Sequence, residues 1–132
     1  MSDSLFSDGA MRTARTALNG LSLRQQAISR NLANVDTPGY RSQTINFEDT
    51  LNHLVDRDVS LSLATTSDSH LLPASQETSF SITRRQGGSF RADQNNVDVD
   101  VEMTDMSETG IQYQAVSQTV SQKLLLLKAL AK

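Results

Sequence analysis

The sequence predicts a mainly α-helical fold, in which long N- and C-terminal helices form an antiparallel coiled-coil pair beside a small, loosely ordered β-containing middle. Apolar side chains follow a helical period in residues 4–36 and again near the C-terminus, in residues 97–132. Residues 37–96 are polar and lack this period. At 132 residues, the chain is expected to form a single domain.

The first predicted helix, residues 4–36, carries an apolar row whose members are spaced alternately by three and four. Gln25 is the one polar member of this row. Gly20 is a weak point, since glycine inside a helix costs about 1 kcal/mol relative to alanine. A turn between two short helices is the alternative there, but the row continues unbroken, which favours one helix. The apolar members are Met11, Ala14, Leu18, Leu21, Ile28, Leu32 and Val35.

A helix-stop motif follows the first helix. Proline at 38 disfavours an α conformation at Thr37, so the helix should end by Asp36. Asn34 could take a left-handed cap conformation at that end. Pro38 and Gly39 suit the two central positions of a type II turn. The motif comprises Asn34, Thr37, Pro38, Gly39 and Tyr40.

The middle of the chain is rich in Ser, Thr, Asp and Gln. Two runs, Val59–Leu63 and Phe80–Thr83, alternate with a period of two and predict half-buried strands. Gly87-Gly88 predicts a loop. Residues 64–78 between the two runs are polar, so we expect a small β region that is only partly ordered.

The C-terminal part begins with Val97–Val101, whose strict alternation predicts a short extended segment. Either Asp98 or Asp100 could cap the helix that follows. Residues 109–122 of this helix carry no charge, which suits packing against copies of the chain, although a solvated polar face is an equal alternative. The apolar row of this helix includes Met106, Tyr113, Val120, Leu124 and Leu127.

Composition argues against several functions. The net charge of −3 is not typical of a nucleic-acid-binding protein, and the absence of cysteine excludes disulfides and thiolate metal sites. The longest apolar run, Leu124–Leu127, is too short to span a bilayer. His53 and His70 match no metal-ligand spacing, and Gly87-Gly88 lacks the rest of a phosphate-binding loop. We therefore predict a protein that is not an enzyme and that has no catalytic residue, metal or cofactor.

Two segments resemble a known family. Residues 32–41, Leu-Ala-Asn-Val-Asp-Thr-Pro-Gly-Tyr-Arg, resemble the motif that ends the first helix of bacterial flagellar rod and hook proteins, and Ile45–Leu51 fits the same pattern. Asn96–Met103 and the later Tyr113-Gln114-Ala115 resemble the C-terminal segment of the smallest rod subunits, those of the proximal rod. FlgC, a proximal-rod protein, is similar in size and ends, so the choice within this group stays open.

The resemblance implies a structural subunit that the flagellar type III apparatus exports unfolded, without a cleaved signal peptide. Such subunits polymerise into the rod of the basal body in the periplasm and are needed for motility. The implied partners are copies of the chain, other rod proteins (FlgC-like), a FliE-like adaptor, the MS ring and the export gate. Phe47 and Leu51 match the Phe-x-x-x-apolar gate-recognition pattern of exported rod and hook subunits, although both could equally be packing residues.

The two apolar rows together form a predicted assembly seam. Isolated helices are marginal in water, so we expect the chain ends to be disordered in the monomer and to fold as the seam is buried in the rod. The alternative is a soluble coiled-coil adaptor or secreted effector that acts without polymerising. The seam comprises Met11, Leu18, Leu21, Ile28, Leu32, Val35, Met106, Tyr113, Val120, Leu124 and Leu127.

Overall fold

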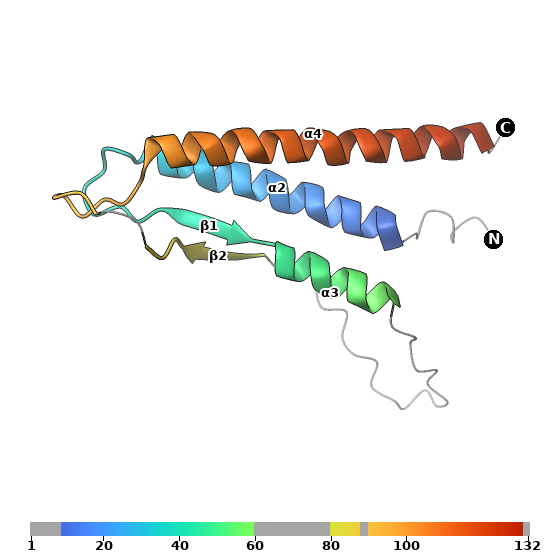
Figure 1. Cartoon of the computed structure of the whole chain (residues 1–132), viewed down its shortest axis with the longest axis horizontal. Coiled ribbons are helices and arrows are strands. Elements are labelled where there is room, and N and C mark those ends of the chain that lie inside the picture. The colour runs from blue at the N-terminus through green and yellow to red at the C-terminus, as the bar shows by residue number, and fades with distance from the viewer. Residues whose placement is uncertain (1–8, 60–79, 88–89, 131–132) are drawn as a thin grey trace, which may run out of the picture.

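Two long helices dominate the computed structural model, which describes residues 9–59, 80–87 and 90–130. In Figure 1, α4 runs antiparallel to α2, and the strands and α3 lie on the side of α2 that faces away from α4. The predicted mainly helical fold, with its long terminal helices packed together and a small sheet in the middle, is confirmed. The elements are α2 Gly9–Ala33, β1 Gln43–Asn46, α3 Glu48–Val59, β2 Ser81–Arg84 and α4 Val99–Leu130.

Helix α2 is continuous through Gly20, so the alternative of two short helices is wrong. The glycine is required by packing. A Cβ atom at Gly20 would lie only 2.6–3.0 Å from three side-chain atoms of Phe47. The missing side chain lets the Phe47 ring lie directly on the helix, which offsets the low helix propensity of glycine.

The end of α2 differs in one detail from the prediction. The helix stops at Ala33, before Asp36 as expected. The left-handed conformation predicted for Asn34 is wrong, because Gln94 is the one non-glycine residue with positive φ in the part of the chain that the structure describes. Asn34 instead donates from Nδ2 to the carbonyl oxygen of Arg30, at 2.8 Å, and so satisfies the last turn without leaving right-handed geometry.

The turn after α2 is of the predicted kind. Gly39 has a φ of 73°, and the Tyr40 amide donates to the Thr37 carbonyl at 3.2 Å. A positive φ at the third residue of a four-residue turn is the geometry of a type II turn. The chain therefore reverses at Pro38-Gly39 and returns along α2 as β1.

The middle of the chain contains more regular structure than the sequence analysis predicted. β1 and β2 pair antiparallel with Ile45 opposite Ile82, which confirms that a strand forms at the predicted place. The predicted half-burial is wrong, because every residue of β2 is exposed. Val59 is the last residue of α3, and the rest of the run to residue 63 lies outside the described residues. Both β1 and α3 were missed, since neither carries a long apolar period of its own.

Helix α4 begins at Val99, so the extended segment predicted for Val97–Val101 is wrong over its last three residues. The Asp98 side chain explains the early start. Its Oδ1 accepts hydrogen bonds from the amides of Asp100, at 3.0 Å, and Val101, at 3.4 Å. This N-cap, which was one of the two predicted, outweighs the strand-like alternation of valine and aspartate.

The apolar core lies between α2, β1 and α3 and is small. Its buried members are Leu21, Ala27, Ile45 and Phe47, with the half-buried Leu51 among the residues packed around them. The residues of α4 that are buried, over its described length, are polar: Glu102 and Thr109. Within the described residues, no helix is long and apolar enough to span a membrane.

Candidate structural site: the clasp and the open face of α4

Two segments far apart in the sequence meet where α2 ends and α4 begins. Asn95, which is fully buried, lies at the centre of this contact. Its Nδ2 donates to the carbonyl oxygens of Asn34, Val35 and Thr37, each at 3.0 Å. Carbonyls at and beyond a helix C-terminus lack helical partners. The Asn95 side chain supplies a hydrogen-bond donor to three of these carbonyls just after α2. Its Oδ1 accepts from the Val97 amide at 2.7 Å.

Neighbours of Asn95 hold the turn from the same side. The Gly39 amide donates to the Asp93 carbonyl at 2.8 Å, and the Ser42 amide donates to Oδ1 of Asn96, also at 2.8 Å. The contacts between residues 31–43 and residues 85–105 are called the clasp below. The clasp brings together the two segments that carry the family resemblance, residues 32–41 and 96–103.

Asn31, on α2, joins the clasp to the sheet. Its Nδ2 donates to the Gln43 carbonyl and its Oδ1 accepts from the Gln43 amide, both at 2.9 Å. The amide thus pairs with β1 as a neighbouring strand would. Arg24 adds a hydrogen bond to the Ile45 carbonyl at 3.1 Å. Side chains of α2 therefore cover the edge of β1 that does not pair with β2.

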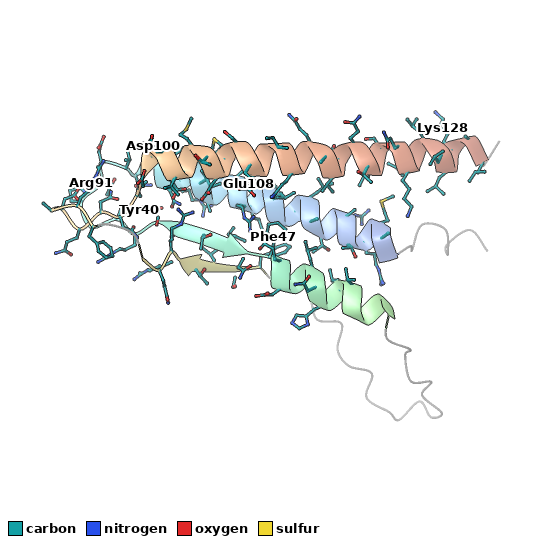
Figure 2. All side chains as sticks on the ribbon, viewed as in Figure 1. Tyr40, Phe47, Arg91, Asp100, Glu108 and Lys128 are labelled. Atoms are coloured by element: carbon teal, nitrogen blue, oxygen red, sulfur yellow. The ribbon has the colours of Figure 1, made fainter. Side chains whose placement is uncertain are left out.

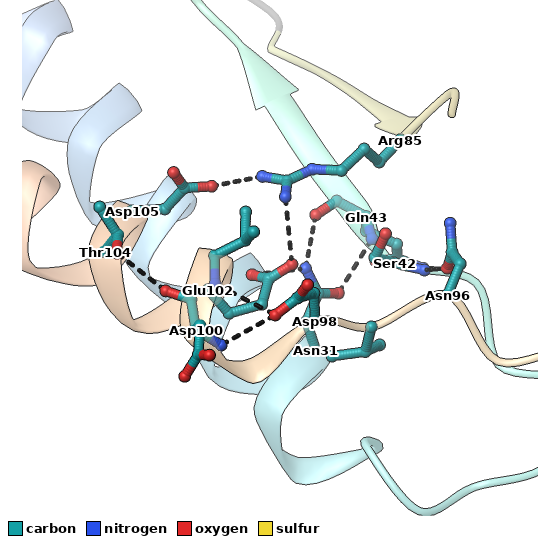
Figure 3. Close-up of polar contacts among 12 residues, drawn as sticks. Asn31, Ser42, Gln43, Arg85, Asn96, Asp98, Asp100, Glu102, Thr104 and Asp105 are labelled. Carbon is teal, nitrogen blue, oxygen red and sulfur yellow. Dashed lines mark hydrogen bonds and ion pairs between the residues drawn. The ribbon is translucent and has the colours of Figure 1, made fainter. Parts of the chain in front are cut away.

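Glu102 connects α4 to Asn31 of α2, as Figure 3 shows. Its Oε2 accepts a hydrogen bond from Asn31 Nδ2 at 3.0 Å, and Arg85 Nη1 lies 3.7 Å from its Oε1. Arg85 also pairs with Asp105. Burial raises the pKa of the Glu102 carboxyl, and this effect outweighs the hydrogen bond from Asn31 and the charge of Arg85, which lower it.

The helix-stop motif is a part of the clasp, but its members differ in exposure. Thr37, Pro38 and Gly39 are exposed, whereas Asn34 and Tyr40 are half-buried. Figure 2 shows Tyr40 at the turn end of the molecule. Its hydroxyl donates to Asn31 Oδ1 at 3.2 Å. The motif therefore shapes the turn, and buried side chains elsewhere hold it in place.

Phe47 and Leu51, the predicted gate-recognition pair, lie inside the subunit. Phe47 is 4% exposed, and Leu51 packs against the same core. The Arg24 guanidinium lies 4.4 Å from the centre of the Phe47 ring, and the Phe80 ring meets it edge-on at 6.4 Å. In the folded chain both residues have a packing role.

The predicted assembly seam is divided by the fold. In α2, Leu21 and Ile28 are buried within the chain itself, and the other seam residues of the first row, Met11, Leu18, Leu32 and Val35, are half-buried. In α4, Tyr113 and Leu124 are exposed. The remaining members of the second row, Met106, Val120 and Leu127, are half-buried.

The surface of helix α4 that does not pack on α2 is called the open face below, and it carries exposed large apolar side chains among polar ones. These apolar side chains occur in residues 99–113 and 124–130 and are each more than a third exposed; Leu124 is 47% exposed. In contrast, the α4 positions that are buried against the rest of the chain are Glu102 and Thr109. The exposed apolar residues are Val99, Val101, Met103, Ile111, Tyr113, Leu124, Leu125, Leu126 and Leu130.

No metal-binding cluster of three or more His, Cys, Asp or Glu residues occurs in the part of the chain that the structure describes. His53 lies exposed on α3, and His70 is outside the described residues. The fold and the clasp therefore define a class: a small helical hairpin, fastened at one end by polar contacts, whose C-terminal helix leaves many large apolar side chains exposed.

Comparison with known proteins identifies the family. A model of the family described as "Flagella basal body rod protein" matches residues 11–41, that is, most of α2 and the turn. The flagellar basal body rod protein FlgB of Bacillus subtilis is 33% identical over 125 residues, which cover 95% of this chain and 94% of that protein. The FlgB protein of Escherichia coli K12 is 34% identical over 116 residues, or 81% of each chain. That of Yersinia enterocolitica is 34% identical over 113 residues, 81% of this chain and 82% of its own.

The chain therefore belongs to the FlgB family of flagellar basal body rod proteins. Membership makes it a structural component of the basal-body rod, and it decides the choice that the sequence motifs left open within the proximal rod.

Proposed function

We propose that this chain is exported by the flagellar type III apparatus and polymerises through α2 and α4 into the proximal rod in the periplasm. Flagellum assembly and motility would then depend on it. The observation that supports this proposal most is the number of large apolar side chains exposed on the open face of α4, among them Tyr113 and Leu124.

No other helix of the described chain covers the exposed apolar side chains of this face. Burying one large apolar side chain stabilises a complex by about 1.5–3 kcal/mol. A chain that leaves many such side chains in water gains this free energy only when neighbouring helices cover them. The uncharged residues 109–122 lie within the same helix, so a neighbouring helix could pack there without burying ions.

The proposed partners follow from family membership. They are further copies of this chain, FlgC-like rod proteins, a FliE-like adaptor, the MS ring and the export gate. Packing of α4 against helices of neighbouring subunits accounts for the first two. The remaining contacts would involve surfaces that the open face of α4 does not identify.

Gate recognition by Phe47 and Leu51 fits this proposal only for an unfolded chain. Phe47 is 4% exposed in the folded subunit, so the gate could not reach its ring there. An exported chain that passes the gate before folding would present both side chains. The same two residues would then serve recognition first and core packing afterwards.

The test is Leu124→Asp in the full-length chain, expressed in a strain that lacks its own copy. We expect rod assembly and swimming to be lost, because the carboxylate would be buried against a neighbouring helix, while secretion of the subunit continues. Leu124→Met is the matched control and should retain all three. Leu21→Asp would be less informative, since Leu21 is 2% exposed in the core of the subunit.

Normal swimming of the Leu124→Asp strain would contradict the proposal. If the purified wild-type chain also stayed monomeric at high concentration and was absent from isolated basal bodies, a soluble adaptor or secreted effector would be the better account.

A further inference from the structure

The clasp contains one charged group that its surroundings satisfy incompletely. The Glu102 side chain is 1% exposed. Its Oε2 has the hydrogen bond from Asn31, but its Oε1 has no hydrogen-bond partner among the described residues. Arg85 Nη1, at 3.7 Å, is beyond hydrogen-bonding distance from that oxygen. Burying a carboxylate under these conditions is costly for the ionised form.

The cation that faces Glu102 is shared with a second carboxylate. Arg85 pairs through Nη2 with Asp105, which is one turn further along α4. Asp98, at the start of the same helix, adds a third negative charge nearby. One guanidinium thus faces two carboxylates, Glu102 and Asp105, with the charge of Asp98 nearby, and Glu102 is the most deeply buried of the three.

Within the described part of the chain, the other elements packed around Glu102 bring no second cation into direct contact with it. Asn31 of α2 is neutral. Tyr40, in the turn, also stays neutral, because burial raises the pKa of its hydroxyl above the usual value. Arg30 lies exposed on α2, and its charge acts on Tyr40. The protonation state of Glu102 therefore depends on its competition with Asp105 for the charge of Arg85.

We propose that Glu102 is a proton-sensitive fastener of α4: protonation of its carboxyl tightens the clasp, and ionisation loosens it. Protonation removes the buried charge, leaves Arg85 to Asp105, and still allows the bond from Asn31. Ionisation keeps the same contacts but leaves one carboxylate in excess around a single guanidinium. A loosened clasp would free the first turns of α4, where Val99 and Met103 are exposed apolar residues.

The direction of the expected pH dependence follows from linkage. The pKa of Glu102 is raised in the folded chain above its ordinary value of 4.5. A raised pKa means that the folded state binds the proton more tightly than the unfolded state. The resulting stabilisation is complete below the unfolded pKa and is lost as the pH rises through the folded pKa. The Glu102 contribution to the clasp is thus greatest in mild acid and weakest at neutral pH.

The first test needs no substitution. In the full-length chain labelled with ¹³C at the glutamate carboxyls, NMR would follow Glu102 as the pH is changed. The reference is the same carboxyl in the chain unfolded by denaturant. We expect Glu102 to titrate at a higher pH in the folded chain than in the unfolded chain. A folded midpoint equal to or below the unfolded one would overturn the proposal.

The second test is Glu102→Gln, a neutral side chain of the same shape, with denaturant unfolding measured from about pH 5 to about pH 8. The wild-type unfolding constant should increase over this range, by up to about tenfold for each unit by which the two pKa values differ. The variant should lack this part of the increase and should be at least as stable as the wild type at the upper end. Asp100→Asn removes an exposed charge from the same turn of α4 and should keep the wild-type dependence.

If Glu102→Gln were less stable than the wild type at every pH, or failed to fold, ionised Glu102 would be a fixed partner of Arg85. The proposal would then be wrong. Because the carboxyl titration uses the wild-type chain, it decides the question independently of the variant.

Discussion

The two halves of the helical hairpin differ in how their helices contact each other. In the clasped half, residues 20–33 of α2 lie against residues 99–109 of α4, and these two stretches contain every buried residue of the two helices in their described ranges. In the free half, residues 9–19 and 110–130 are half-buried or exposed. Figure 1 shows the two ribbons separating toward that end.

The contrast lies in which side chains are buried. The clasped half buries Asn31, Glu102 and Thr109 between its helices, and hydrogen bonds fix its geometry. The free half is rich in leucine, yet Leu125 and Leu126 are each 66% exposed. Many exposed apolar side chains on one helix are informative in a way that a single exposed leucine is not. Polar contacts thus define the subunit, and the apolar surface remains available for its assembly.

The largest expected effect on stability is the loss of a buried aromatic ring from the core, compared with the loss of an exposed ring at the turn end. Phe47→Ala should cost about 3–5 kcal/mol of unfolding free energy, because a buried ring is removed from a small core. Phe90→Ala is the matched control. Phe90 also has an arginine, Arg41, over its ring at 4.2 Å, but it is 53% exposed, and its loss should change stability by less than about 0.5 kcal/mol.

Chemical denaturation of both variants would measure this difference. Equal losses for the two phenylalanines would show that the cation–π contacts, rather than burial, carry the stability.

A smaller effect, of opposite sign in the two halves, is expected at two helical glycines. Gly20→Ala forces a methyl group to within 2.6–3.0 Å of Phe47, and overpacking of this kind costs about 1–3 kcal/mol. The gain in helix propensity, about 1 kcal/mol, offsets part of this cost. Gly110→Ala would meet only Gln25 Nε2 at 3.9 Å and should stabilise the chain by about 1 kcal/mol.

Thermal unfolding of the two variants gives the signs directly. A stabilised Gly20→Ala chain would mean that Phe47 is not seated on α2.

The smallest expected effect concerns pH. Burial raises the pKa of the Glu48 carboxyl, but hydrogen bonds from Arg24 and from backbone amides outweigh it, so the pKa lies below its ordinary value of 4.5. A lowered pKa gives stability that is present above the unfolded pKa and is lost as the pH falls through the folded pKa. Glu48 is 52% exposed, so Glu48→Gln should cost only about 0.2–1 kcal/mol at neutral pH.

That difference should disappear in acid, which denaturation at several pH values would show. Asp49→Asn removes a charge from the same first turn of α3 without touching Arg24 and should not reproduce it. A loss that persists in acid would assign the effect to packing. The expected direction is opposite to that of Glu102, so the two carboxyls can be told apart.

The sequence predicts those parts of the fold whose signals are local. The apolar periods predict α2 and α4, the alternation at residues 80–83 predicts β2, and Pro38-Gly39 predicts the turn. The differences have two causes. One local signal can outweigh another, as where the Asp98 cap starts α4 despite the alternation that follows it. A tertiary contact can also outweigh a local preference, as where Phe47 makes Gly20 a packing requirement rather than a weak point.

The sequence predicts only a part of the clasp. The motifs at residues 32–41 and 96–103 are readable, but nothing in their spacing says that they meet. Asn31 and Asn95 appear as ordinary polar residues, since their roles depend on carbonyls supplied by distant segments. Glu102 is one of several acidic residues near the start of α4, and its burial follows only from the packing of α4 on α2.

Hydrogen exchange of backbone amides, compared between the isolated subunit and purified basal bodies, tests the central claim most directly. We predict that residues 24–33 and 102–109 are already protected in the isolated subunit, because the clasp holds them. Residues 121–130, which lie beyond the α4 contact of Val116 with the core, should exchange quickly there and become protected only in the rod. Equal protection of residues 121–130 in both states would contradict the account, since the free half would then need no neighbouring subunit.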